Sequence, residues 1–202
     1  MFRRRMWRVG IALCVVGVTL VGCSPRPRRP APDPLATDTA TLKIVRTLDR
    51  LAVEGFTFQS AVSGLKDVAT TADLAEDPSA ERAALEKNRF VQAYLKLFTR
   101  GEYSVGALAY EFQNAAGATG YMGYTLDDAE RNHGARFFSV PAVAGARGQT
   151  QRNEDEGFHL RAVTFVRDAV VYSVVIGGPL LATAEDVVRL AQTLDRIVAS
   201  TN

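Results

Sequence analysis

The chain has 202 residues, with 24 lysines and arginines against 22 aspartates and glutamates. Seven of the basic and two of the acidic residues precede residue 41, which leaves 17 basic and 20 acidic residues in 41–202 and a formal net charge of −3 there. A mildly acidic domain without a basic stripe makes a nucleic-acid partner unexpected.

Residues 1–22 have the composition of a secretory signal peptide. Four arginines and no acid occupy the first eight positions, and an apolar run of 13 residues follows from Val9 to Val21. A membrane-spanning helix needs roughly 20 apolar residues, so the run favours a cleaved signal over a permanent span. Gly22 provides the small residue that a peptidase requires before its cut.

The Leu20-Val21-Gly22-Cys23 tetrad resembles the lipobox of bacterial lipoproteins. The resemblance implies that the Cys23 thiol receives diacylglycerol and further acyl chains such as palmitate. Several acyl chains on one residue suffice for stable anchoring. We therefore expect an extracytoplasmic protein anchored to the bacterial cell membrane, or to an outer membrane where the cell has one. The alternative is an ordinary cysteine beside a plain cleavage site.

The second cysteine, Cys14, lies inside the apolar run and would be removed with it. No disulfide, cysteine metal site or thiolate nucleophile is then expected in the mature domain. Residues 23–40 contain five prolines, which favour an extended tether. The three arginines of this tether either stay in solvent or contact anionic headgroups.

Residues 41–202 are predicted to form a single α+β domain. The first half reads as helix, strand, two short helices and a hairpin. The second half reads as helix, four strands and a last helix that begins at a capping box of Thr183 and Asp186. Hairpin connections make the sheet mostly antiparallel, with helices packed on its faces. The expected ranges are 41–54, 56–63, 70–76, 78–87, 90–99, 103–112, 114–131, 136–140, 147–151, 158–167 and 169–176.

Two details of this pattern can be checked in a structure. Alternation in 90–99 places Gln92 and Lys96 on the face opposite its apolar residues. Gly117, Gly120 and Gly123 each cost about 1 kcal/mol relative to alanine in a helix. They imply a helix that lies very close to the sheet, or one that frays.

Several runs resemble a recurring pattern in uncharacterised actinobacterial-type exported lipoproteins, over about residues 50–200. The runs are Phe90-Val91-Gln92-Ala93-Tyr94, Tyr110-Glu111-Phe112 leading into Ala115-Ala116-Gly117-Ala118, and Val140-Pro141-Ala142-Val143-Ala144-Gly145-Ala146. The resemblance implies a layout similar to the Mog1/PsbP-like α/β sandwich, a fold of binding and accessory proteins more than of enzymes. It carries over no catalytic residues.

Signals for catalysis or metal binding are weak. Asp128, Glu130 and His133 could meet a divalent metal, but a histidine at a helix end is favoured by the helix dipole alone. His159 follows the acidic run 154–156, where a solvated loop is the simpler interpretation. A nucleophile elbow, a phosphate-binding glycine loop and a Ser-x-x-Lys signature are missing from the sequence. We expect no catalytic residues, metal or cofactor.

Aromatic residues give the one ligand hypothesis. Five of them gather in sequence around the second hairpin strand and the following helix, and they could line a cleft for an amphipathic molecule. The alternative is that they are core and edge residues of an ordinary sandwich. They are Tyr103, Tyr110, Phe112, Tyr121 and Tyr124.

Three functions remain open from the sequence. The first is a non-enzymatic binding or accessory module that meets an envelope protein, lipid or glycan. The second is a carrier or sensor of a small amphipathic ligand, which requires a cavity of several hundred Å³ beneath helix 114–131. The third is a hydrolase or metal enzyme, which requires His133 or His159 to lie in a cleft with two carboxylates.

Overall fold

The computed structural model describes residues 39–153 and 157–201. The predicted signal peptide, Cys23 and the tether up to residue 38 lie outside the described residues. The elements, in chain order, are α1 (Thr39–Asp49), β1 (Thr57–Phe58), β2 (Gly64–Lys66), α2 (Val68–Ala72), α3 (Pro78–Lys87), β3 (Phe90–Arg100), β4 (Tyr103–Phe112), α4 (Ala115–His133), β5 (Arg136–Ser139), β6 (Arg147–Asn153), β7 (Phe158–Arg167), β8 (Val170–Gly178) and α5 (Ala184–Thr201).

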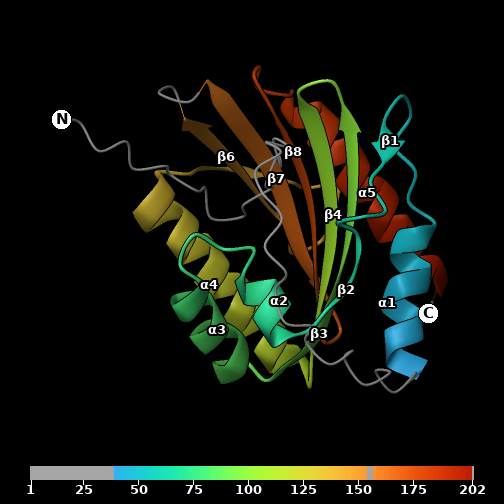
Figure 1. Ribbon diagram of the computed structural model, residues 1–202, viewed down its shortest axis with the longest axis vertical. Coiled ribbons are helices and arrows are strands. Elements are labelled where there is room, and N and C mark those ends of the chain that lie inside the picture. The colour runs from blue at the N-terminus through green and yellow to red at the C-terminus, as the bar shows by residue number, and fades with distance from the viewer. Residues whose placement is uncertain (1–38, 154–156, 202) are drawn as a thin grey trace, which may run out of the picture.

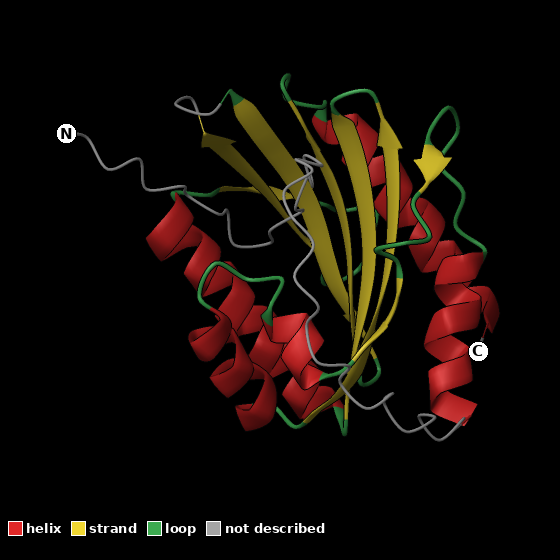
Figure 2. Cartoon of the chain, in the orientation of Figure 1, coloured by secondary structure: helices red, strands yellow, loops and turns green. Residues whose placement is uncertain are grey.

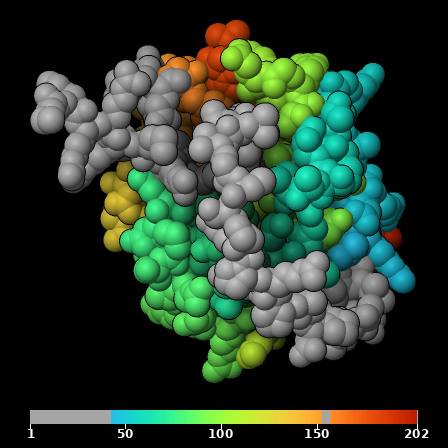
Figure 3. Space-filling model, in the orientation of Figure 1, coloured from blue at the N-terminus to red at the C-terminus, as the bar shows by residue number. Residues whose placement is uncertain are grey.

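The strands form one antiparallel sheet in the order β1-β3-β4-β8-β7-β6-β5, with β2 also paired to β3. Helices α2, α3 and α4 cover one face of the sheet, and α1 and α5 cover the other (Figures 1 and 2). Side chains of α2, α3 and the segment through β1 and β2 form much of the described surface on the side seen in Figure 3. The predicted α+β class, a mostly antiparallel sheet with helices on its faces, is confirmed.

The face covered by α1 and α5, here called the α1/α5 face, holds the larger apolar core. Leu48 of α1 and Leu194 of α5 are fully buried against sheet residues such as Val105. Phe165 and Tyr172, on neighbouring strands, stack with their ring centroids 5.6 Å apart. The opposite face, called the α4 face, carries two smaller apolar clusters beneath α4, α2 and α3.

Lys96 belongs to the α1/α5 face, where it holds the end of α1. Its Nζ donates to the carbonyl oxygens of Leu48, Asp49 and Leu51 at 3.2, 3.0 and 2.9 Å. The Leu48 oxygen also accepts from the Leu51 amide at 3.0 Å, and the ammonium adds a donor to all three carbonyls where α1 ends, at Asp49 and not at residue 54. The alternation in 90–99 correctly assigns the residues of β3 to the two faces of the sheet. Because helices cover both faces, Lys96 and Gln92 are buried as well.

The largest differences from the predicted strands lie at β1 and at the end of β8, and the predicted helix 70–76 is the shorter α2, Val68–Ala72. Of the predicted strand 56–63, only Thr57 and Phe58 pair with β3, because the chain then turns back and Ser63 N donates to Gln59 O. The sheet was expected to break at Gly177 and Gly178, yet β8 continues through both. A side chain at Gly178 would collide with the Tyr103 ring at 2.4 Å, so the glycine makes room for an aromatic neighbour.

The glycines of α4 do permit close packing, but against the end of α3. A Cβ at Gly117 would lie 2.2 Å from the backbone oxygen of Asn88, and one at Gly120 would lie 2.3 Å from the Asn88 Oδ1. Asn88 is the residue that caps the C-terminus of α3. The expected close contact with the sheet is therefore largely a contact with α3, and Gly123 faces open space.

The capping box at the start of α5 is confirmed. Thr183 Oγ1 accepts a hydrogen bond from the Asp186 amide at 3.1 Å, and Asp186 Oδ2 accepts from the Thr183 amide at 3.3 Å. Both bonds satisfy amides that would otherwise lack partners at the helix start.

Candidate functional site: a cavity beneath α4

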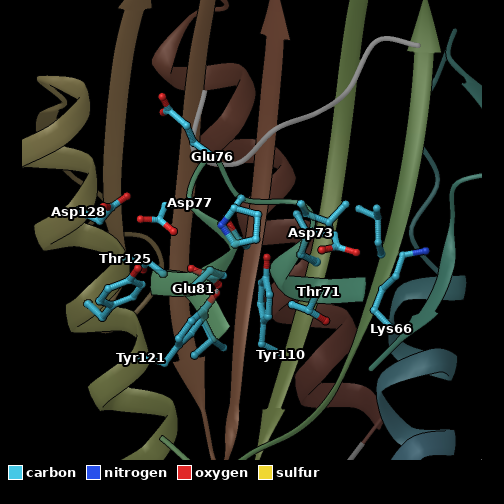
Figure 4. A pocket seen from close by; sticks show the side chains of 18 of the residues that line it. Lys66, Thr71, Asp73, Glu76, Asp77, Glu81, Tyr110, Tyr121, Thr125 and Asp128 are labelled. Carbon is cyan, nitrogen blue, oxygen red and sulfur yellow. Dashed lines mark hydrogen bonds between the residues drawn. The ribbon is translucent and has the colours of Figure 1, made fainter. Parts of the chain in front are cut away.

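A cavity of about 880 Å³ lies on the α4 face, between α4, the α2–α3 segment and the sheet. Its floor is made by residues of β3, β4, β6, β7 and β8, and α4 and the segment from α2 into α3 form opposite walls. Figure 4 shows Tyr121, Thr125 and Asp128 on the α4 side and Lys66 across from them. Small-molecule sites typically enclose about 300–1,000 Å³, so the volume is in the range of a ligand site.

The floor is largely apolar. Leu95 and Leu97 of β3 and Leu108 of β4 form what is called here the leucine floor. Beside it, Thr164 and Ser173 join their hydroxyls at 3.1 Å across β7 and β8. These two hydroxyls satisfy one another, so the pair brings little polarity to the floor.

Helix α4 is placed by its two caps and by helical spacing. Asn114 Oδ1 accepts from the Gly117 amide at 2.9 Å at its start, and Gly134 in the left-handed conformation, with φ of 58°, ends it. Residues three and four apart share a helix face. Along the cavity this face carries Tyr121, Tyr124, Thr125, Asp128, Asn132 and His133.

Three tyrosines form a continuous aromatic surface, called here the tyrosine wall: Tyr110, Tyr121 and Tyr124. Adjacent ring centroids lie 5.2 Å apart for the first pair and 6.2 Å apart for the second. Burial raises the pKa of Tyr121 well above its ordinary value and that of Tyr124 to about 12, so both phenols remain neutral at physiological pH.

Glu81, in the first turn of α3, is the carboxylate closest to this wall. Tyr121 donates its phenolic hydrogen to Glu81 Oε1. Burial raises the pKa of Glu81, the nearby charge of Asp128 adds to the increase, and the hydrogen bond from Tyr121 opposes it. The position of Glu81 follows from the start of α3, where Asp77 accepts from the amides of Ser79 and Ala80 at 3.0 Å each and Pro78 occupies the first turn.

His133 lies on the cavity wall between two carboxylates. Its Nδ1 is 3.8 Å from Glu76 Oε2, and its Nε2 is 3.4 Å from Asp128 Oδ2. This meets the geometric requirement set above for a hydrolase. Each ring nitrogen faces a carboxylate, an arrangement that fixes the orientation of the imidazole.

Asp128, Glu130 and His133 are possible metal ligands from the sequence, and the structure does not bring these three together. Among the described residues, no group of three or more histidine, cysteine, aspartate or glutamate side chains is arranged to hold a metal ion. Glu130 points away from the cavity wall that holds Asp128 and His133, since it is exposed and does not line the cavity. His159 is half-buried in β7, opposite Arg152, and the acidic residues 154–156 lie outside the described residues.

The five aromatic residues singled out by the sequence take three different places. Tyr110, Tyr121 and Tyr124 line the cavity. Phe112 lies behind them, with its ring centroid 5.1 Å from that of Tyr121. Tyr103 is at the other end of β4, over Gly178, and takes no part in the cavity.

Sequence reasoning missed Glu81 and Thr71. An acid in the first turn of a helix is favoured by the helix dipole, so the sequence alone gives no reason to assign Glu81 a further role. Thr71 lies in α2, a helix of five residues with no periodic pattern of its own. Its side chain is buried on the cavity wall, and its Oγ1 has no hydrogen-bond partner within 39–153 and 157–201.

Comparison with solved structures finds a likeness, whereas comparison of the sequence with known families and curated proteins does not. The extracellular domain of PknH from Mycobacterium tuberculosis aligns with 73% of this chain and 82% of its own at 14% identity, with a TM-score of 0.45. The resemblance to Mog1/PsbP-like lipoproteins stays a prediction. None of the helices in the described ranges combines the length and apolar composition of a membrane span.

Proposed function

We propose that this chain is an extracytoplasmic lipoprotein, anchored through diacylglycerol on Cys23, whose domain binds a small amphipathic ligand without catalysing a reaction. The observation that carries the binding function is the cavity of about 880 Å³ beneath α4, where a carrier or sensor requires one. The export signal and the lipobox-like tetrad in residues 1–23 support the location.

The cavity surface has the composition that an amphipathic ligand needs. The leucine floor offers apolar area for a hydrocarbon portion, while the opposite rim carries carboxylates and phenols for a polar group. Ligand sites of this kind combine mostly apolar walls with a few polar groups that fix orientation. A binding or accessory module that contacts an envelope protein remains compatible with this function, since a carrier delivers its ligand to a partner.

Occluding the cavity tests the proposal. Thr125 lines the cavity from α4, so Thr125→Trp should fill part of it. The chain from Ser24 onward, which contains every described element, would be titrated with the neutral fluorescent amphiphile N-phenyl-1-naphthylamine. We expect saturable binding at one site, and a loss of about tenfold or more in affinity in Thr125→Trp.

Thr119→Trp is the matched control, because Thr119 is exposed on the same helix and does not line the cavity. It should bind as the wild type does. Binding that is absent from the wild type, or unaffected by Thr125→Trp, would contradict the proposed cavity function.

The anchor is tested separately by metabolic labelling with an alkyne fatty acid. Label should appear on the wild-type protein in the membrane fraction and disappear in Cys23→Ala. Equal labelling of both proteins would exclude Cys23 as the lipidated residue.

A further inference from the structure

The charged residues that line the cavity are strongly unbalanced. Within the described part of the chain, five carboxylates and one lysine line it, together with His133. Lys66 lies across the cavity from the α4 wall with Asp73 on its side. Asp77, Glu81 and Asp128, in contrast, lie toward α4 (Figure 4). The carboxylates are Asp73, Glu76, Asp77, Glu81 and Asp128.

These carboxylates have few positive partners. Among the residues that the structure describes, none of the five forms an ion pair with a lysine or arginine, and the basic group nearest to Glu76 and Asp128 is the His133 imidazole. Glu81 is the most enclosed, and burial raises its pKa because the ionised form loses water without gaining a cation. A ligand that brings a positive charge would supply the missing partner.

The tyrosine wall is adjacent to the same carboxylates. Tyr121 donates to Glu81 and lies between Tyr110 and Tyr124, with ring centroids 5.2 and 6.2 Å away. Aromatic faces attract cations through the ring quadrupole, and ammonium groups are recognised by such rings combined with carboxylates. The leucine floor, on the strands beneath, is free of charge.

Thr71 provides an independent observation on the same cavity. Its side chain is 98% buried, since the residue is only 2% exposed, and its Oγ1 lacks a hydrogen-bond partner among the described residues. Buried hydroxyls without partners are uncommon, and leaving one unsatisfied costs free energy. Because Oγ1 is itself buried, a polar group of a bound ligand would satisfy it only after the Thr71 side chain rotates toward the cavity.

We propose that the ligand of this cavity is a cationic amphiphile of the alkylammonium class. Its positive head lies between Glu81, Asp128 and the tyrosine wall, and its hydrocarbon portion lies on the leucine floor. This inference rests on the proposed function, because it names the chemical class of the ligand for the same cavity.

Three amphiphiles with the same eight-carbon tail test the charge preference: octyltrimethylammonium, octyl glucoside and octanoate. Each would be titrated below its critical micelle concentration into the chain from Ser24 onward by isothermal titration calorimetry at pH 7. We expect octyltrimethylammonium to bind about tenfold or more tightly than the other two, which corresponds to one good cation–π or ion-pair contact.

Variants locate the head group. Glu81→Gln keeps an acceptor for Tyr121, and Asp128→Asn keeps the shape of the side chain. Each should weaken octyltrimethylammonium by about tenfold and leave octyl glucoside unchanged, which also shows that the fold and the cavity are intact. Glu102→Gln, in the exposed β3–β4 turn away from the cavity, should change neither affinity.

The outcomes separate the two proposals. Equal affinities for the three amphiphiles would overturn the cationic preference while supporting amphiphile binding in the cavity. A preference for octyltrimethylammonium that survives in the double variant Glu81→Gln/Asp128→Asn would overturn the assigned head-group position. Binding of none of the three would contradict both the inference and the proposed function.

Discussion

The two faces of the sheet are packed differently, although the same central strands supply both. On the α1/α5 face, two helices with apolar stripes bury large side chains such as Phe165 and Tyr172, and Lys96 satisfies the end of α1. On the α4 face, a glycine- and alanine-rich helix and two short helices leave a cavity of about 880 Å³. The comparison teaches that the covering helices, more than the strands, give this domain one filled face and one face with a cavity.

The largest expected effect compares buried leucines on the two faces. Leu194→Ala, in the filled α1/α5 core, should cost about 3–5 kcal/mol, because the removed atoms leave a new void. Leu108→Ala should cost only about 2 kcal/mol, because Leu108 already borders the cavity. Urea unfolding monitored by circular dichroism measures both. Equal losses would mean that the cavity does not relieve packing on the α4 face.

Removing the buried ammonium tests the polar part of the α1/α5 face. Lys96→Met keeps most of the hydrocarbon stem but removes the donor to the carbonyls of Leu48, Asp49 and Leu51, which should cost about 2–3 kcal/mol. Lys43→Met is the control, since its ion pair with Asp168 is long, at 3.7 Å, and exposed, and should cost less than about 1 kcal/mol. A small loss in Lys96→Met would show that α1 ends at Asp49 for another reason.

Two glycines of α4 should respond in opposite directions. Gly117→Ala should lose about 1–3 kcal/mol, because its Cβ would lie 2.2 Å from backbone at Asn88. Gly123→Ala should gain up to about 1 kcal/mol, because no atom lies within 4 Å and alanine is the better helix former. Thermal unfolding compares them directly. Stabilisation by both would refute the close contact between α4 and the end of α3.

The smallest effect concerns the pH dependence of the α4 face. The pKa of Glu81 is raised above its usual 4.5 in the folded state, so the folded protein binds this proton more tightly than the unfolded chain does. The resulting stabilisation is fully present below pH 4.5. This stabilisation is lost as the pH rises through the raised pKa. Glu81→Gln is neutral throughout, so its stability relative to wild type should be greater at pH 7 than at pH 3. Urea unfolding at both pH values checks this, and a constant difference would argue against a desolvated Glu81.

Local sequence signals predicted most elements of the fold. The 103–112 and 158–167 strands and the 78–87 helix have the predicted bounds, because alternation, tight turns and caps are properties of neighbouring residues. The predicted bounds are wrong where a residue distant in sequence determines where a helix or strand ends. Lys96 sets the end of α1 from a strand 45 or more residues away, and Tyr103 allows the glycines of β8 to stay in the sheet.

The candidate site was predicted only in part, for a related reason. Tyr110, Tyr121 and Tyr124 were grouped because they are near in sequence, and the fold places them side by side. Proximity in sequence failed for Tyr103, because β4 is ten residues long and places Tyr103 at the opposite end of the strand from Tyr110. Glu81 joins the tyrosines through the packing of α3 against α4, which depends on contacts that no short pattern encodes.

The position of β8 affects when the sheet can be completed. This strand, residues 170–178, is flanked by β4 and β7 in the middle of the sheet, although it is the last strand in the chain. Until it emerges, the β3–β4 hairpin and the β5–β7 meander have no strand between them and cannot join. For a precursor that crosses the membrane as an unfolded polypeptide from its N-terminus, this order delays completion of the sheet until nearly the whole chain has passed through the translocation channel.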